Sequence, residues 1–212
     1  RNTTAGIIKF TSRKPSEDFD AYVKAGVGSY GLINLEGAVG GEIAEDVSAR
    51  LSVLNQSKDD WIDNGFTGQK DSLGGHEDKA FRLQVAYNPT NELDVLFNVH
   101  SRSYEGTSSV MRANVLTTGS DELNSNYDRD VVYYNGGMDL ADPSCVVVQN
   151  NANNCVILDS NPQAYDQDGW SVNLNYDFGD FTLTSITAME QAEGRSKGDI
   201  DGGNDMGPGF IP

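Results

Sequence analysis

The sequence predicts an all-β protein, specifically an antiparallel transmembrane β-barrel of which about seven strands are present. Three observations lead to this fold class. Seven runs of residues alternate apolar and polar side chains with the period of a strand. No sustained helical period occurs, and 23 glycines accompany many Asn, Asp and Ser residues. The long connections between the runs all fall at one end of the predicted sheet, as they do in outer-membrane barrels.

The seven runs follow one another along the chain. In the first run Ala21 and Val23 share one face, whereas Tyr22 and Lys24 share the other. The last run is the weakest, because neither of its faces is cleanly apolar. The runs are residues 19–31, 32–41, 47–55, 80–88, 93–102, 170–178 and 181–190.

The alternation predicts two faces on one continuous sheet. The apolar row is expected to face outward, and it comprises Ala21, Val23, Leu35, Leu51, Leu83, Val85, Val95, Phe97, Val172 and Leu174. The opposite side is expected to carry Arg50, Arg82, Gln84, Asn98 and Asn173.

Connection lengths separate a membrane barrel from a soluble β-sandwich. A sandwich also buries one face and wets the other, so alternation alone fits both folds. If the first strand runs upward, turns at 40–46, 88–92 and 177–180 close every downward end. The long links then all lie at the upper end, and a sandwich has no reason to separate loop lengths in this way.

Aromatic residues agree with the barrel prediction. Tyr87, Tyr176, Phe178 and Phe181 all fall beside the short turns, where an interfacial aromatic girdle would lie. The alternative is the general preference of aromatic residues for strands.

Composition excludes some classes of partner. The net charge is −17 and the sequence pI is about 4.2, so a phosphate backbone would be repelled and no nucleic-acid partner is expected. No run approaches the ~18 apolar residues that a membrane helix needs.

Two cysteines, Cys145 and Cys155, flank an Asn-rich stretch in the longest link. Their spacing matches no metal site, and no histidine lies nearby to complete one. A small hairpin closed by a local disulfide, formed in an oxidising compartment, is the favoured prediction. Two unpaired thiols are the alternative.

The opening segment resembles a known family. "RNTTAGIIKFTSRKP", followed by "FDAYVKAGVGSYGLINLEGAVGG" and "ARLSVLNQSKDDWIDN", looks like the plug-to-barrel junction of TonB-dependent outer-membrane receptors. The matching residues are a turn glycine, a strand ending in a basic residue and proline, and a G-x-G-x-Y hairpin. They are Gly6, Ile7, Ile8, Ser12, Lys14, Pro15, Gly26, Gly28 and Tyr30.

The resemblance implies a domain organisation. Residues 1–16 would be the C-terminal strand of a plug domain and its linker, and residues 17–212 the N-terminal part of the barrel. Long extracellular loops would span 57–79, 103–168 and 191–212. Such barrels have 22 strands, so the chain is expected to be a fragment of a longer receptor.

The resemblance also implies a function. The expected activity is energised uptake of a scarce nutrient across the outer membrane of a Gram-negative bacterium, foremost an iron–siderophore complex. Receptors for cobalamin, haem or glycans share the scaffold and remain alternatives. The expected partners are the small-molecule ligand, outer-membrane lipid, and the TonB energy-transducing protein through a segment outside this chain.

No catalytic constellation, phosphate loop or histidine cluster is found, so neither enzymatic activity nor a cofactor or metal is expected. Function is assigned to binding, with ligand contacts at the upper ends of the strands and in the loops. For the aromatic candidates, the alternative role is to pack the loops against one another. The candidate residues are Trp61, Phe66, Arg102, Tyr104, Tyr133 and Tyr134.

Two other classes of function stay open. A passive porin would lack a plug, and the opening segment argues against it. A soluble secreted β-sandwich used for adhesion or carbohydrate binding would not depend on detergent.

Overall fold

The computed structural model describes residues 11–65, 68–107, 110, 115–117, 119–125, 127–132, 145–147, 155–157 and 162–196. Within these residues the secondary structure is entirely β. No helix in this part of the chain is long and apolar enough to cross a membrane. The predicted plug strand begins at Ile7, so it lies outside the described residues except at its end.

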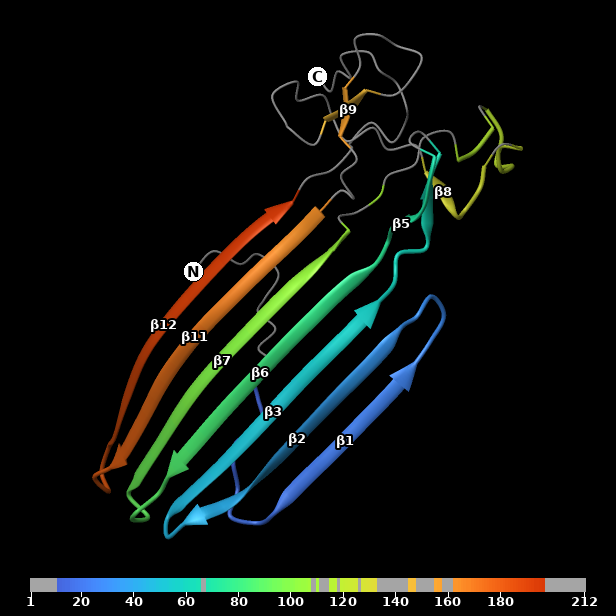
Figure 1. Cartoon of the computed structure of the whole chain (residues 1–212). Helices are drawn as coiled ribbons and strands as arrows, with labels where there is room; N and C mark the ends of the chain where they lie inside the picture. The colour runs from blue at the N-terminus through green and yellow to red at the C-terminus, as the bar shows by residue number, and fades with distance from the viewer. Residues whose placement is uncertain are drawn as a thin grey trace.

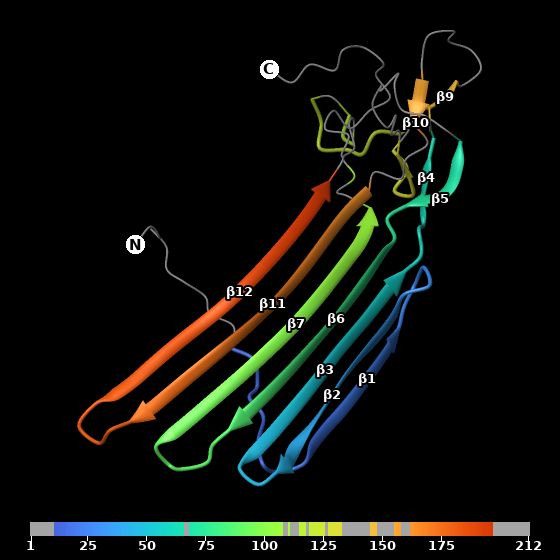
Figure 2. The ribbon, with the colours of Figure 1, turned by 60° about the vertical axis from the view of Figure 1, so that its left-hand side comes forward.

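One seven-stranded antiparallel sheet dominates the structure (Figures 1 and 2). Its strands lie in chain order, and every pair of neighbours in the sheet is antiparallel. The strands, in sheet order, are β1 (Asp20–Val27), β2 (Ile33–Ala44), β3 (Val47–Lys58), β6 (His76–Tyr87), β7 (Leu93–Thr107), β11 (Pro162–Asp177) and β12 (Thr182–Ser196).

All seven predicted runs are strands of this sheet, so the all-β antiparallel fold class is confirmed. The cross-strand register also confirms the two predicted faces. One apolar row runs across the whole sheet, and its members are paired directly from strand to strand. This row is Ala21, Val39, Leu51, Leu83, Val99, Trp170 and Met189.

We call the face that carries this row the outer face, and the opposite one the inner face. The inner face is defined by the row Asp20, Gly40, Arg50, Gln84, Asn98 and Ser171. The predicted outward set and the predicted opposite set fall on the outer and inner faces respectively.

Burial on the two faces is opposite to that of a soluble sheet. Arg50 and Gln84 on the inner face are each only 6% exposed, whereas Leu51 and Val53 on the outer face are 42% and 48% exposed. Other exposed apolar residues of the outer face are Val23, Val27, Ile33, Leu35, Val39, Phe81, Phe97, Leu183 and Met189. Monomeric soluble proteins rarely expose a continuous apolar surface of this extent.

The strands continue into the ranges predicted as loops. Residues 57–58 and 76–79, 103–107 and 162–168, and 191–196 all belong to strands. β7 and β11, with 15 and 16 residues, extend to about 50 Å at ~3.3 Å per residue. Both strands are therefore longer than the about 9–11 residues with which a tilted strand crosses a bilayer. Charged residues replace apolar ones at their upper ends, which hides the strand period in the sequence.

Short turns close the lower end of the sheet, and the longer connections lie at the upper end, as predicted (Figures 1 and 2). The β1–β2 hairpin at the upper end turns through Tyr30 and Gly31, whose φ angles are 61° and 65°. Gly28 N–H donates to the Leu32 carbonyl at 2.9 Å, so three residues, 29–31, form the turn.

The upper connections contain strands that the sequence did not predict. β4 (Ile62–Asn64) pairs antiparallel with β5 (Gln69–Leu73) and parallel with β8 (Val131–Val132). Ile62, Leu73 and Val132 form its buried core. The links after β3 and β7 therefore join in one small sheet, here called the loop sheet.

Candidate ligand-binding site

The inner face is crossed by a segment that precedes the sheet. Residues 11–19 run across the face that points away from the viewer in Figure 1. Arg13 forms an ion pair with Asp20 at 3.1 Å, and Lys14 lies 3.9 Å from the carboxylate of Asp94. Ser12 accepts a hydrogen bond from Arg82. Three different strands therefore hold this segment against the inner face.

Ion pairs fill the inner face. Arg50, whose side chain is 7% exposed, pairs with Asp20. Arg102 donates two hydrogen bonds to Asp78, at 3.0 Å from Nε and 2.7 Å from Nη2. This two-pronged geometry fixes the guanidinium as well as neutralising it. A polar surface so densely paired suits a wall around a water-filled interior.

A glycine opens a gap in this face. Gly169 lies between His100 and Glu190 on the same cross-strand row. A Cβ at position 169 would stand 2.3 Å from Glu190 Oε2 and 2.8 Å from His100 Cε1. The missing side chain lets His100 Nε2 reach Glu190 Oε1 at 3.2 Å, and Gln167 donates to the same oxygen at 2.6 Å.

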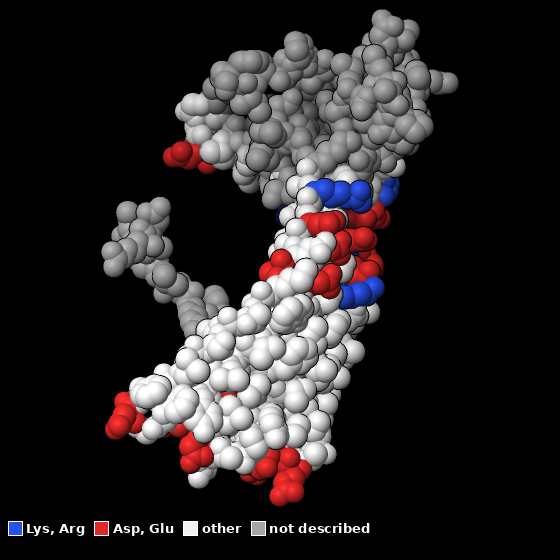
Figure 3. Space-filling model, turned by 90° about the vertical axis from the view of Figure 1, so that its left-hand side faces the viewer, with Lys and Arg blue, Asp and Glu red and all other residues white. Residues whose placement is uncertain are grey.

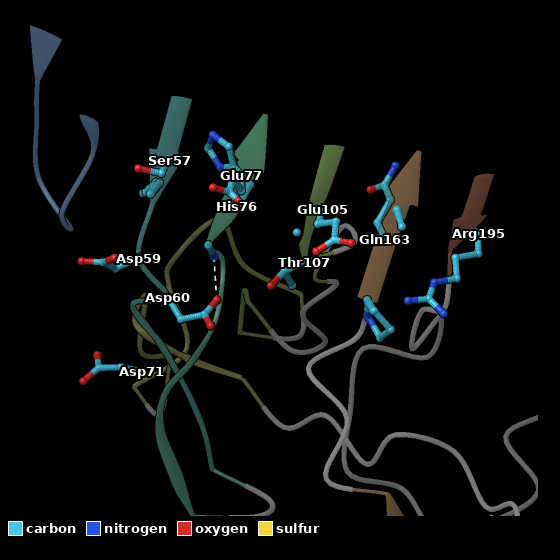
Figure 4. A pocket seen from close by; sticks show the side chains of 15 residues that line it. Ser57, Asp59, Asp60, Asp71, His76, Glu77, Glu105, Thr107, Gln163 and Arg195 are labelled. Atoms are coloured by element: carbon cyan, nitrogen blue, oxygen red, sulfur yellow. Dashed lines mark hydrogen bonds between the residues drawn. The ribbon is translucent and has the colours of Figure 1, made fainter. Parts of the chain in front are cut away.

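The upper rim contains an open hollow of about 660 Å³, within the size range of small-molecule sites. Figure 4 shows its lining side chains, which come from β3, β6, β7, β11, β12 and the link after β3. Carboxylates outnumber cations in the lining: Asp59, Asp60, Asp71, Glu77 and Glu105 face Lys58 and Arg195. Such a lining disfavours strongly anionic ligands at the rim.

Lys58, which lines this hollow, also lies over an aromatic stack. The rings of Tyr30 and Trp61 are stacked with centroids 4.6 Å apart. Lys58 Nζ lies 5.2 Å from the first centroid and 5.0 Å from the second, within cation–π range. Trp61 also packs against the core of the loop sheet. The β1–β2 turn and the loop sheet are therefore joined at the rim.

One ion pair within the loop sheet shifts two pKa values. The Lys70 ammonium and the backbone N–H of Asp71 both bond the Asp63 carboxylate and lower its pKa below the ordinary value. The same carboxylate raises the pKa of Lys70. Both side chains therefore stay charged over an extended pH range.

Two solved structures resemble the chain. The ferric yersiniabactin uptake receptor FyuA from Yersinia pestis matches with a TM-score of 0.60 and 16% identity, over 87% of this chain and 25% of that one. The FpvAI–pyocin S2 complex matches with a TM-score of 0.56 and 13% identity, over 84% of this chain and 20% of that one. No protein-family profile matches the sequence.

The likeness to these structures shows the fold. Both neighbours are TonB-dependent barrel receptors rather than enzymes, and the seven-stranded sheet is arranged like part of their wall. The chain spans a quarter of the length of FyuA and a fifth of the FpvAI chain.

The structure places some of the predicted ligand residues and not others. Arg102 and Tyr104 lie on the inner face of β7, where Arg102 is bound to Asp78 and Tyr104 stacks on His76 at 6.1 Å. Trp61 precedes β4 and packs, partly buried, against the core of the loop sheet. Phe66, Tyr133 and Tyr134 lie outside the described residues.

The cysteine hairpin is present, but its register differs from that of a bridged pair. β9 (Cys145–Val147) pairs Cys145 with Ile157 of β10 (Cys155–Ile157), and Val147 with Cys155. The cysteines therefore occupy diagonal positions, which are about 7–8 Å apart in such ladders. A bridge needs Cα atoms ~4.4–6.8 Å apart, so this register does not support the disulfide, which stays a prediction.

Sequence reasoning missed the partners of the inner-face cations. Alternation put Arg50 and Arg82 on the correct face, but only the folded structure shows that Arg50 meets the Asp20 carboxylate and Arg82 the Ser12 hydroxyl. In the described part of the chain, no three His, Cys, Asp or Glu side chains come close enough to hold a metal ion.

Proposed function

We propose that the chain is part of the wall of a TonB-dependent outer-membrane receptor for energised uptake of a scarce nutrient, foremost an iron–siderophore complex. Cobalamin, haem and glycan complexes are the alternative ligands. In this proposal residues 1–16 are the end of a plug domain and its linker, and residues 17–212 belong to the barrel. The protein lies in the outer membrane of a Gram-negative bacterium, and its other partner is TonB.

The observation that carries the proposal is the inversion of the two faces. Fully burying a large aliphatic side chain stabilises a fold by about 1.5–3 kcal/mol relative to leaving it in water. The outer face leaves large aliphatic side chains such as Val23, Leu51 and Val53 exposed, while Arg50 and Asp78 are buried on the inner face. Contact with lipid recovers that loss, and a polar interior accounts for the paired charges.

The distribution of charge along the strands supports the same proposal. Figure 3 shows acidic residues at the lower turns and a cluster of acidic and basic residues at the upper strand ends, with an uncharged band between them. At the lower edge of this band, Phe178 stacks on Phe181 at 4.7 Å and lies 4.5 Å from Tyr176. Aromatic residues at this level are typical of the membrane interface.

Ligand capture is assigned to the upper rim. The rim hollow includes residues of the link after β3, on the side where the long connections lie. In the proposal Trp61 and Tyr104 contact the ligand at this upper end, together with Phe66, Tyr133 and Tyr134, and Arg102 contacts it deeper on the inner face.

Uptake by cells tests the proposal. The complete reading frame should be expressed in a Gram-negative host that lacks its own siderophore receptors, and labelled ferric siderophores supplied one class at a time. Uptake of one class should depend on the receptor and stop in cells without TonB. Uptake that continues without TonB would indicate a passive porin, and a protein found in the periplasm or medium would reject the membrane assignment.

A further inference from the structure

The inner face contains a second hollow, well below the rim, whose contents the proposed function leaves open. It measures about 420 Å³, and its lining comes from β1, β2, β3, β6, β7 and β11. Its lining includes Tyr22, Glu36, Ser52, Arg82, His100 and Arg102. We call it the mid-wall hollow.

The charged groups of the mid-wall hollow are mostly neutralised by their neighbours. Glu36 accepts hydrogen bonds from Tyr22 at 2.6 Å and from Lys24 at 3.4 Å. Arg102 is held by both oxygens of Asp78. His100 lies between Asn98 and Glu190, at 3.2 Å from each.

Arg82 is the exception. Among the described residues no carboxylate lies within ion-pair distance of its guanidinium, and its one hydrogen-bond partner is the Ser12 hydroxyl. Its Nε is shielded from solvent and has no partner in this part of the chain. A guanidinium offers five N–H donors arranged to match a planar oxyanion, so most of its capacity is unused.

From this geometry we propose that Arg82 forms the centre of an oxyanion-binding site in the mid-wall hollow, for a carboxylate or phosphate group of the transported ligand. The Ser12 oxygen stands where one oxygen of that anion would bind. Ser12 belongs to the segment that crosses the inner face, so a shift of this segment would expose Arg82. The inference rests on the proposed function, since it gives the ligand an anionic group.

Electrostatics favours an anion at Arg82 over other positions on the inner face. The chain carries a net charge of −17, and two other inner-face cations, Arg50 and Arg102, are already paired with Asp20 and Asp78. From the described carboxylates Arg82 has only the longer-range electrostatic attraction of Glu190, so its guanidinium keeps unused capacity for an oxyanion.

Inorganic phosphate is the probe for the test. The full-length receptor in detergent should broaden the ³¹P resonance of millimolar phosphate at fixed ionic strength, and citrate should compete if carboxylates also bind. Arg82→Gln should weaken phosphate binding by about tenfold or more, the change that corresponds to 1.4 kcal/mol. Lys79→Gln is the matched control, because it removes one positive charge from the same strand on the opposite face.

Two further variants keep the test decisive if Arg82→Gln does not fold. Arg82→Lys keeps the charge but loses the planar fork, so binding should weaken. Ser12→Ala removes the covering hydroxyl, so binding should strengthen. The site would be overturned if the wild type, Arg82→Lys and Ser12→Ala all broadened the phosphate resonance equally. It would also be overturned if the wild type did not broaden that resonance.

The two proposals fail separately. A protein that takes up a siderophore through TonB but does not bind phosphate at Arg82 contradicts only the oxyanion site. A protein that never reaches the outer membrane contradicts the proposed function, whatever phosphate does to the purified chain.

Discussion

A single arginine on the outer face of β12 should be far more disruptive than one on the inner face. Met189 and Ala188 are neighbours on this strand, and both side chains are exposed, Met189 at 56%. Met189 lies on the apolar row that crosses the whole sheet, whereas Ala188 pairs with Ser171 on the inner face. Their equal exposure removes burial as a cause of any difference.

The magnitude follows from the lipid environment. An arginine facing lipid near the middle of the bilayer costs about 2–4 kcal/mol, or roughly 30- to 700-fold in the folding equilibrium at 1.4 kcal/mol per tenfold. Met189→Arg should therefore lose that much stability. Ala188→Arg faces the interior and should stay within about 0.5 kcal/mol of wild type, as exposed substitutions do.

Guanidinium unfolding of the full-length protein in lipid vesicles measures both variants. Met189→Ala, compared in parallel, separates the loss of the side chain from the gain of charge. If the two arginine variants were equally stable, the outer face would not contact lipid, and the reasoning from inverted burial would be refuted.

Three further predictions concern the upper connections. Trp61→Ala removes the side chain that joins the Tyr30 ring to the loop-sheet core, so hydrogen exchange should speed up in the loop sheet and not in the seven strands; uniform acceleration would contradict this. The pKa of Asp63 is below its ordinary value of 3.8, so its contribution to stability is present above that pH and is lost as pH falls through the lowered pKa. Hydrogen exchange in β4 and β5 should therefore become faster as the pH falls through this lowered pKa, and Asp63→Asn should abolish this acid response. An unchanged acid response in this variant would argue against the ion pair. For Cys145 and Cys155, peptide mapping without reduction should find one linked peptide if the predicted disulfide forms, whereas two alkylatable thiols would disprove it.

The main sheet was predictable because its signal is local and repetitive. In β3 and β6, for example, every second residue from Val47 to Val53 and from Phe81 to Tyr87 is apolar or aromatic, and the strands pair with their neighbours in chain order. β12 gave a weak signal because Thr187 and Ser185 stand on its outer row opposite Val172 and Leu174. β12 forms a strand because it pairs with β11 along its whole length.

The loop sheet and the inner-face contacts could not be predicted in the same way. β4 and β8 have only three and two residues, too few to show a period, and they pair in parallel across more than 60 residues of chain. The contacts of Arg82 with Ser12 and of Lys14 with Asp94 join parts of the chain separated by 70 and 80 positions. Such pairs depend on register and on the path of the segment across the sheet, which alternation does not determine.

Spin labels on β6 test most directly whether the outer face lies against lipid. Single cysteines at Leu83 and Gln84, in a background with Cys145→Ser and Cys155→Ser, would carry a nitroxide in the full-length protein in lipid vesicles. The label at position 83 should be accessible to oxygen and shielded from a water-soluble nickel chelate. The label at position 84 should show little accessibility to oxygen from the lipid phase. Equal accessibility at both positions, or the reverse pattern, would contradict a membrane-spanning wall.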